Sequence, residues 1–268
     1  MGHSKNKAST SSAQSGRRNT VTNDNGGHDA WDYSPPKLPK ASAIKLGDIY
    51  GVQPFDGVRN PGFRSSTSHT IWLTYKTAAN DWQPKVAICE SAAEAAVAIE
   101  VLLSPDIHDV SFQPLTVKFE IDGKSREYTH DLLMTFKSGR RSLVFVRNGE
   151  SLSRPKTWRE ISAIREATPP TAANDLVVID ADDYSRQRRE NLFRMHEMVQ
   201  QTDQEADDLT LFAAENLSTL WQIKDIFPHV ALPQRRVFRA CLRLIARKKL
   251  TANMDNVILE TSCVQVAA

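Results

Sequence analysis

Residues 128–147, YTHDLLMTFKSGRRSLVFVR, contain two apolar stretches separated by the turn Ser138-Gly139-Arg140. The apolar and β-branched residues predict one strand over 128–136 and another over 142–146, joined by this turn. Asp131 stands inside the first stretch, where a carboxylate is poorly placed for a merely solubilising role. We therefore interpret Asp131 as a candidate site residue.

The chain before this hairpin predicts a helix that carries two more carboxylates. Residues 90–103, ESAAEAAVAIEVLL, are rich in alanine and have apolar residues at helical spacing, which indicates one buried face. Glu90 and Glu94 are four residues apart and would share a face of this helix, although glutamates near a helix N-terminus can also be a solvated face. Further strands are predicted over 70–75, 85–89, 110–113, 115–121 and 176–179, and further helices over 157–167 and 186–201. This alternation is typical of a mixed α/β domain.

Carboxylates on a helix and on a neighbouring strand can hold Mg²⁺ or Mn²⁺, which favour oxygen ligands, and such an ion can orient a water at a scissile phosphate. A third ligand and a lysine two residues later would face the same side of the next strand. Phe145 and Arg147 occupy those two positions. A phenylalanine side chain cannot bind a metal, and arginine differs from lysine in shape and charge distribution.

The order of these elements resembles the N-terminal domain of TnsA-type transposon endonucleases, a branch of the PD-(D/E)xK superfamily. The matched residues are Glu90-Ser91, Glu94, Ser111-Phe112-Gln113-Pro114, Asp122-Gly123, Tyr128-Thr129-His130-Asp131 and the strand after Gly139. The resemblance implies a restriction-endonuclease-like mixed sheet with flanking helices and a Mg²⁺ or Mn²⁺ cofactor. It assigns Glu94 and Asp131 as metal ligands, Arg147 to the catalytic lysine's position, and Glu90 and Gln113 to supporting roles. The chain departs from the family at His130, where the family has proline, and at Phe145 and Arg147.

A basic helix is predicted near the C-terminus. Seven basic residues and no acidic residue lie between Arg235 and Lys249, and apolar residues form one stripe along the helix predicted over 233–248. Two shorter helical segments precede it, and a turn over 250–254 and a strand over 256–260 are predicted to follow, which is the element order of a winged helix. Such a helix favours DNA as a partner, with contacts to phosphates or the major groove from Arg235, Arg236, Arg239, Arg243 and Arg247. A solvated face or an acidic protein partner is the alternative.

The composition divides the chain into a tail and two domains. Residues 1–43 are polar and predict a disordered tail, 44–202 would form the nuclease-like domain, 203–208 an acidic linker, and 208–268 the winged-helix-like domain. The formal net charge is only +2, so the charge of the whole chain does not by itself indicate nucleic acid. The three cysteines have no ligand-like spacing, and no apolar run approaches the roughly 20 residues of a membrane helix, which together predict a cytoplasmic protein with reduced thiols.

Three functions agree with these residues. The first is a DNA-binding, TnsA-like component of a transposition machine with a degenerate nuclease centre; the resemblance implies a transposase and an ATPase as its protein partners. The second is an active Mg²⁺-dependent endonuclease that cuts at the ends of a mobile element. The third is a transcriptional or assembly regulator that acts through the winged helix.

Overall fold

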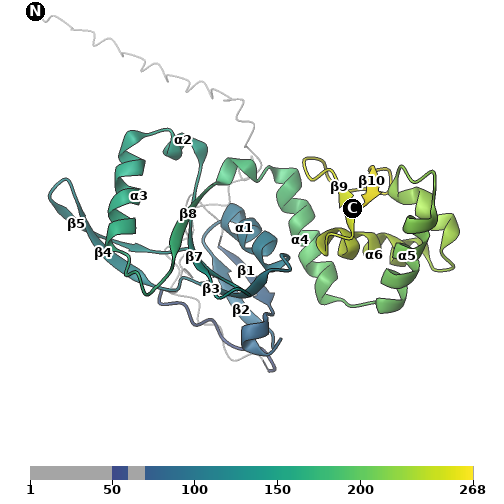
Figure 1. Ribbon diagram of the computed structural model, residues 1–268, viewed down its shortest axis with the longest axis horizontal. Helices are drawn as coiled ribbons and strands as arrows, with labels where there is room; N and C mark the ends of the chain where they lie inside the picture. Colours follow the sequence, from purple (N-terminus) through teal and green to yellow (C-terminus); the bar gives the residue numbers. More distant parts are fainter. Residues whose placement is uncertain (1–49, 60–69, 268) are drawn as a thin grey trace, which may run out of the picture.

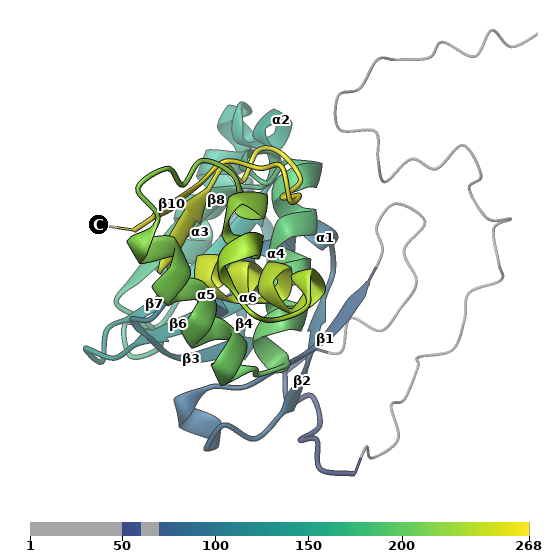
Figure 2. The same ribbon diagram turned by 90° about the vertical axis from the view of Figure 1, so that its right-hand side faces the viewer.

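The computed structural model describes residues 50–59 and 70–267 and shows a mixed α/β fold. The predicted tail over 1–43 lies outside the described residues. Figure 1 shows the sheet-containing part on one side of helix α4 (Arg186–Gln200) and a smaller, mostly helical unit on the other side. Figure 2 looks from the side of this smaller unit.

A four-stranded sheet forms the centre of the larger part. Its strands, in spatial order, are β3 (Ile107–Phe112), β6 (Leu132–Phe136), β7 (Arg141–Arg147) and β8 (Asp175–Asp180). The pairs β3–β6 and β6–β7 are antiparallel, whereas β7 and β8 are parallel, so the sheet is mixed. A parallel pair needs a long crossover, and here the crossover contains α2 (Gly149–Leu152) and α3 (Pro155–Ala167).

Separate apolar cores cover the two faces of the sheet. On one face, α1 (Ala92–Leu102) packs over alternate residues of β6 and β7, among them Leu132 and Val144, with the hairpin of β1 (Ile71–Tyr75) and β2 (Lys85–Cys89) beside it. On the other face, Phe145 packs with α3 and with the hairpin of β4 (Thr116–Ile121) and β5 (Lys124–Thr129). The alternation along β7 therefore places Val144 and Phe145 in different cores.

The predicted strand over 128–136 is wrong, because the chain bends in its middle. β5 ends at Thr129 and β6 begins at Leu132, so His130 and Asp131 lie between two strands of different sheets. The amide of His130 donates to the carbonyl of Leu115 at 3.0 Å, and the carbonyl of Asp131 accepts from the amide of Gln113 at 3.0 Å. A two-stranded hairpin and a four-stranded sheet thus meet at Asp131.

Helix α4 belongs to both parts of the molecule. Its Leu192 packs against Ala96 and Ile99 of α1, while Met195 and Met198 enter the core of the C-terminal unit. The ring nitrogen Nε2 of His196 bonds to the carbonyl oxygen of Thr74 at 2.8 Å and ties α4 to β1. The boundary predicted at residue 202 therefore lies at the end of a helix that both cores share.

The C-terminal unit contains α5 (Gln204–Asn216), the 3₁₀ helix η3 (Ile223–His229), α6 (Gln234–Ala246), and the paired strands β9 (Leu250–Ala252) and β10 (Val264–Val266). The predicted basic helix is confirmed. The predicted acidic linker over 203–208 is wrong, because Asp203 accepts a hydrogen bond from the amide of Ala206 and caps α5, which begins within this run. The closing strand lies at β10 rather than within 256–260.

Among residues 50–59 and 70–267, no helix is both long and apolar enough to cross a membrane.

Candidate functional site

Glu94 is a buried carboxyl in the first turn of α1. Ser91, rather than Glu90, is the N-cap: its Oγ accepts a hydrogen bond from the amide of Glu94 at 3.1 Å. Glu90 therefore precedes the helix, and the predicted shared helical face of Glu90 and Glu94 is wrong. The side chain of Glu94 reaches back instead, so that Oε2 accepts from the amide of Glu90 at 2.7 Å. Oε1 of Glu94 is buried and has no hydrogen-bond partner within the described part of the chain.

Asp131 is the second buried carboxyl, held where β5 and β6 meet. Its Oδ2 accepts hydrogen bonds from the hydroxyl of Tyr128 at 3.0 Å and from the amide of Val146 at 3.2 Å. Nη1 of Arg147 lies 3.9 Å from the same oxygen. Asp131 is 6% exposed and Glu94 is 4% exposed, so water screens neither group well.

The two carboxyls are close enough to influence each other. Burial raises the pKa of Glu94 well above its usual value, and repulsion from Asp131 raises it further. Burial also raises the pKa of Asp131, while Arg147 and the hydrogen bonds from Val146 and Tyr128 act in the opposite direction. The structure thus brings together Glu94 and Asp131, which sequence reasoning had paired from a resemblance.

Gln113 and Arg59 complete one wall of this site. Gln113 is fully buried, has a left-handed backbone at φ 50°, and follows the end of β3. Its Oε1 accepts from Nε of Arg59 at 3.3 Å, and Arg59 also forms an ion pair with Glu90. Arg59 was missed by the sequence analysis, since it lies in a segment without hydrophobic periodicity and far before Glu90 in the sequence. Only the fold places it here.

The closing strand β7 presents no third metal ligand. Phe145 is 1% exposed and packs in the core under α3. The guanidinium of Arg147 lies over the Phe145 ring, with Cζ 4.3 Å from the ring centroid, and its Nη1 donates to the carbonyl of Val146 at 2.7 Å. Across the described residues, no group of three or more His, Cys, Asp or Glu side chains could hold a metal ion. Two carboxyls suit Mg²⁺ or Mn²⁺, but the residues present do not fit the complete metal centre that the resemblance implies.

His130 is next to Asp131 in sequence but belongs to a different environment. Its ring is fully buried, and Nε2 lies 3.2 Å from Oγ1 of Thr168. That hydroxyl donates to the carbonyl of Ile164 at 2.7 Å, so it accepts the Nε2 proton of His130. Burial lowers the pKa of His130 to about 4. A neutral histidine bonded toward α3 is a structural residue.

We expect His130 to make the folded state less stable in acid. Its folded pKa of about 4 lies below the ordinary value of 6.5, so the unfolded chain binds the proton first and stability falls as the pH drops from about 6.5 toward 4. Between about pH 7.5 and about pH 5 this contribution is about 2 kcal/mol. The raised pKa values of Glu94 and Asp131 act oppositely, because their contribution to stability is lost as the pH rises.

The measurement is therefore a difference between two proteins. Urea unfolding of the wild type and of His130→Gln at both pH values should show that the wild type loses about 2 kcal/mol more than the variant on acidification. Equal losses in the two proteins would contradict a buried, neutral His130.

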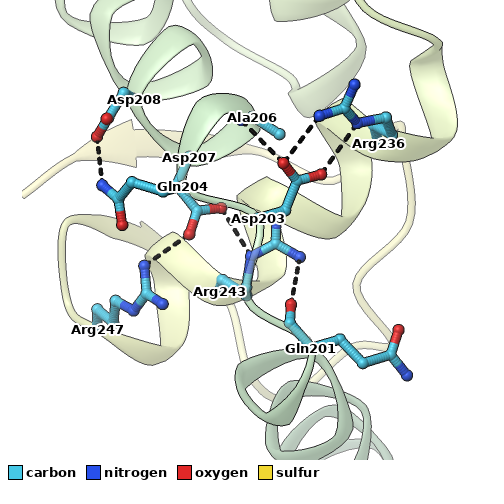
Figure 3. Close-up of polar contacts among 9 residues, drawn as sticks. All are labelled: Gln201, Asp203, Gln204, Ala206, Asp207, Asp208, Arg236, Arg243 and Arg247. Carbon is cyan, nitrogen blue, oxygen red and sulfur yellow. Dashed lines mark hydrogen bonds and ion pairs between the residues drawn. The ribbon is translucent and has the colours of Figure 1, made fainter.

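The basic residues of α6 form a second candidate site, and the structure divides them. Arg236 makes a bidentate pair with Asp203, through Nε at 3.0 Å and Nη2 at 2.8 Å (Figure 3). Its Nη2 also reaches Glu205 at 2.7 Å. The bond from Arg236 lowers the pKa of Asp203 to about 2. Arg236 is thus turned toward the start of α5 rather than toward a partner.

Arg243 and Arg247 converge on a single carboxylate. Nε of Arg243 lies 2.7 Å from Oδ1 of Asp207, and Nη1 of Arg247 lies 2.6 Å from Oδ2 (Figure 3). The Arg243 side chain is only 2% exposed and the Asp207 side chain 3%. Arg243 therefore cannot touch DNA in this conformation, and its predicted DNA contact is replaced by a role in joining α5 to α6.

The remaining basic residues of this segment face solvent at least in part. Arg235 is exposed and Arg239 is partly exposed, and both lie in the first half of α6. Lys248 and Lys249, at the end of the helix, are exposed as well. Helix α4 covers another part of α6, where the guanidinium of Arg194 lies 5.6 Å from the Phe238 ring centroid. Of the five arginines predicted to contact DNA, Arg235 and Arg239 form no ion pair within the described part of the chain.

Comparisons with known proteins add no family to these observations. No family model matches the chain, and no curated protein matches it. The site is accordingly interpreted from its own residues.

Proposed function

We propose that this protein is a DNA-binding, TnsA-like component of a transposition machine whose nuclease centre has become degenerate. The observation that carries the proposal is the closing strand, where Phe145 fills an apolar core and Arg147 approaches Asp131 at 3.9 Å. The buried pair Glu94 and Asp131 supports the ancestry, since helix α1 contributes one carboxyl and the junction of β5 and β6 contributes the other. By the same resemblance, a transposase and an ATPase are the proposed protein partners.

The order of elements in the C-terminal unit supports its assignment as a winged helix. A short bridge between Gln222 and Cys263 joins the chain after α5 to the chain before β10, and η3, α6 and the β9–β10 pair follow in turn. This order of helix, short strand, helix, basic helix and hairpin is compatible with a winged helix in which α6 and the hairpin approach DNA. The nuclease alternative is favoured by one observation, the buried carboxyl pair, and is opposed by the lack of a third ligand among the described residues.

The proposal predicts a DNA surface made by Arg235 and Arg239 with Lys248 and Lys249. Replacing Arg235 and Arg239 together with alanine should weaken binding to a short DNA duplex about tenfold and reduce the magnitude of the salt slope by about 2, since two phosphate contacts are lost. Fluorescence anisotropy at several salt concentrations measures both quantities.

A matched control comes from the other part of the molecule. Arg140 and Arg159 are exposed arginines in ion pairs with Asp175 and Asp122, and their double alanine variant should bind DNA as the wild type does. An unchanged affinity and salt slope in the Arg235 and Arg239 variant would reject this surface. Cleavage of the duplex by the wild type in Mg²⁺, abolished by Asp131→Asn, would instead establish the nuclease alternative.

A further inference from the structure

The buried acid pair of Glu94 and Asp131 can be fully ionised only beside a compensating positive charge. Two carboxyls that are 4% and 6% exposed cannot both ionise without a nearby cation, because water screens them poorly and they repel each other. Arg147 and Arg59 are the cations that lower the pKa of both groups. The two arginines differ in the groups that their guanidinium contacts and in the exposure of their side chains.

Arg147 is held in place by contacts on several sides. Its guanidinium lies over the rings of Phe145 and Tyr128, with Cζ at 4.3 Å and 5.5 Å from the two centroids, and Nη1 donates to the Val146 carbonyl. Such stacking favours arginine over lysine, whose ammonium is compact and strongly hydrated. The Tyr128 hydroxyl at the same time donates to Asp131. The aromatic rings thus fix the cation next to the carboxylate that it neutralises.

Arg59 lowers the pKa of Glu94 more than Arg147 does, but it is the more exposed of the two cations. Its guanidinium is shared between an ion pair with Glu90 and a hydrogen bond to Gln113, and its side chain is 50% exposed. Arg147 is 39% exposed and is the larger influence on Asp131.

We propose that Arg147 takes the electrostatic role of a divalent metal ion beside Glu94 and Asp131. Its positive charge thereby keeps such an ion from binding the two carboxyls. This inference rests on the proposed function for its interpretation of the site as a former metal centre. Phe145 has a matching role, since it supplies the ring that holds the guanidinium instead of an oxygen that would bind a metal. The domain is then stable without a metal ion. Replacing Arg147 would allow a metal ion to bind the two carboxyls.

The test compares the melting temperature of the full chain with and without Mn²⁺. The wild type should not respond to Mn²⁺, because Arg147 already neutralises the Asp131 carboxylate. Arg147→Met keeps much of the side-chain length and removes the charge, so it should lower the melting temperature by about 5 °C and introduce a rise with Mn²⁺. Arg159→Met, which removes an exposed arginine paired with Asp122, is the matched control and should change neither quantity appreciably.

A double variant separates the charge from the packing of the side chain. Adding Asp131→Asn to Arg147→Met removes the excess negative charge, so it should restore part of the lost stability and abolish the response to Mn²⁺. If Arg147→Met alone fails to fold but the double variant folds, the recovery of folding still supports the inference. If neither folds, the charge of Arg147 is not its role, and the inference is overturned.

Two further outcomes would also overturn the inference. One is a wild-type melting temperature that rises with Mn²⁺ and loses this rise in Asp131→Asn. The other is an Arg147→Met variant that is as stable as the wild type and indifferent to the metal. Wild-type DNA binding does not depend on either result, so failure of the proposed function would be seen separately in the anisotropy experiment.

Discussion

Asp207→Ala is expected to lower the free energy of unfolding by about 4 kcal/mol, because it leaves a buried arginine without its partner. Arg243 and Asp207 are both almost fully buried, and Asp207 also binds Arg247. After the substitution, the Arg243 guanidinium would keep its hydrogen bond to the carbonyl of Gln201 at 3.3 Å but would lose the carboxylate. An unpaired charge in this position costs more than the pair itself contributes.

The adjacent residue provides a close control. Asp208 has the same side chain on the same helix, but it is exposed and its carboxylate bonds to Gln204 at 2.7 Å (Figure 3). Asp208→Ala should change the free energy of unfolding by no more than about 0.5 kcal/mol. Urea unfolding followed by circular dichroism compares the two variants at one pH. Equal effects at the two positions would show that burial of the Asp207–Arg243 pair does not govern the stability of this unit.

The same pair shows why the exposed basic residues of α6 could be only partly predicted from the sequence. Helical periodicity placed Arg236 and Arg243 on a cationic stripe of the predicted helix, and a helix is what the structure contains. Periodicity gives the face of a residue on its own helix, but not which neighbouring element covers that face. The acidic run that was interpreted as a linker is the start of α5. Its Asp203 and Asp207 form ion pairs with three of the basic side chains.

The acidic site was more predictable, since its central residues lie in strongly patterned segments. Glu94 stands in an alanine-rich helix and Asp131 in an apolar stretch, and both are buried, as a site residue in such surroundings should be. The bend at His130 and Asp131 was missed because β5 and β6 read as one continuous strand when the partner strands are unknown. Arg59 carries no local pattern, and only the path of the chain brings it to Gln113.

The last prediction concerns the attachment of the β9–β10 connection to α4. Asn191 is fully buried, and its Nδ2 donates to the carbonyls of Met254 at 3.2 Å and Asn256 at 2.8 Å. Its Oδ1 accepts from the amide of Ile258 at 2.9 Å. Because Leu192 of the same helix packs on α1, this one asparagine connects the wing-like segment to the larger part of the molecule.

Asn191→Ala is expected to cost about 3 kcal/mol, since it leaves two carbonyls and one amide of a buried segment without their partner. Arg194 would still donate to the carbonyl of Ile258 at 2.8 Å, so the segment should loosen at its start more than at its end. Urea unfolding gives the loss of stability, and hydrogen exchange at the Ile258 amide reports the local opening.

Asn216→Ala is the appropriate control, because Asn216 is an exposed asparagine whose Nδ2 bonds to the carbonyl of Phe212 at the end of α5. That variant should lose about 0.5 kcal/mol or less and keep the protection of Ile258. If Asn191→Ala retained both wild-type stability and slow exchange at Ile258, the segment would be held by its apolar contacts alone. Faster exchange at Ile258 with little change in the β6 and β7 amides would place the opening in the β9–β10 connection. It would also show that α4 can release this segment while it stays packed on α1.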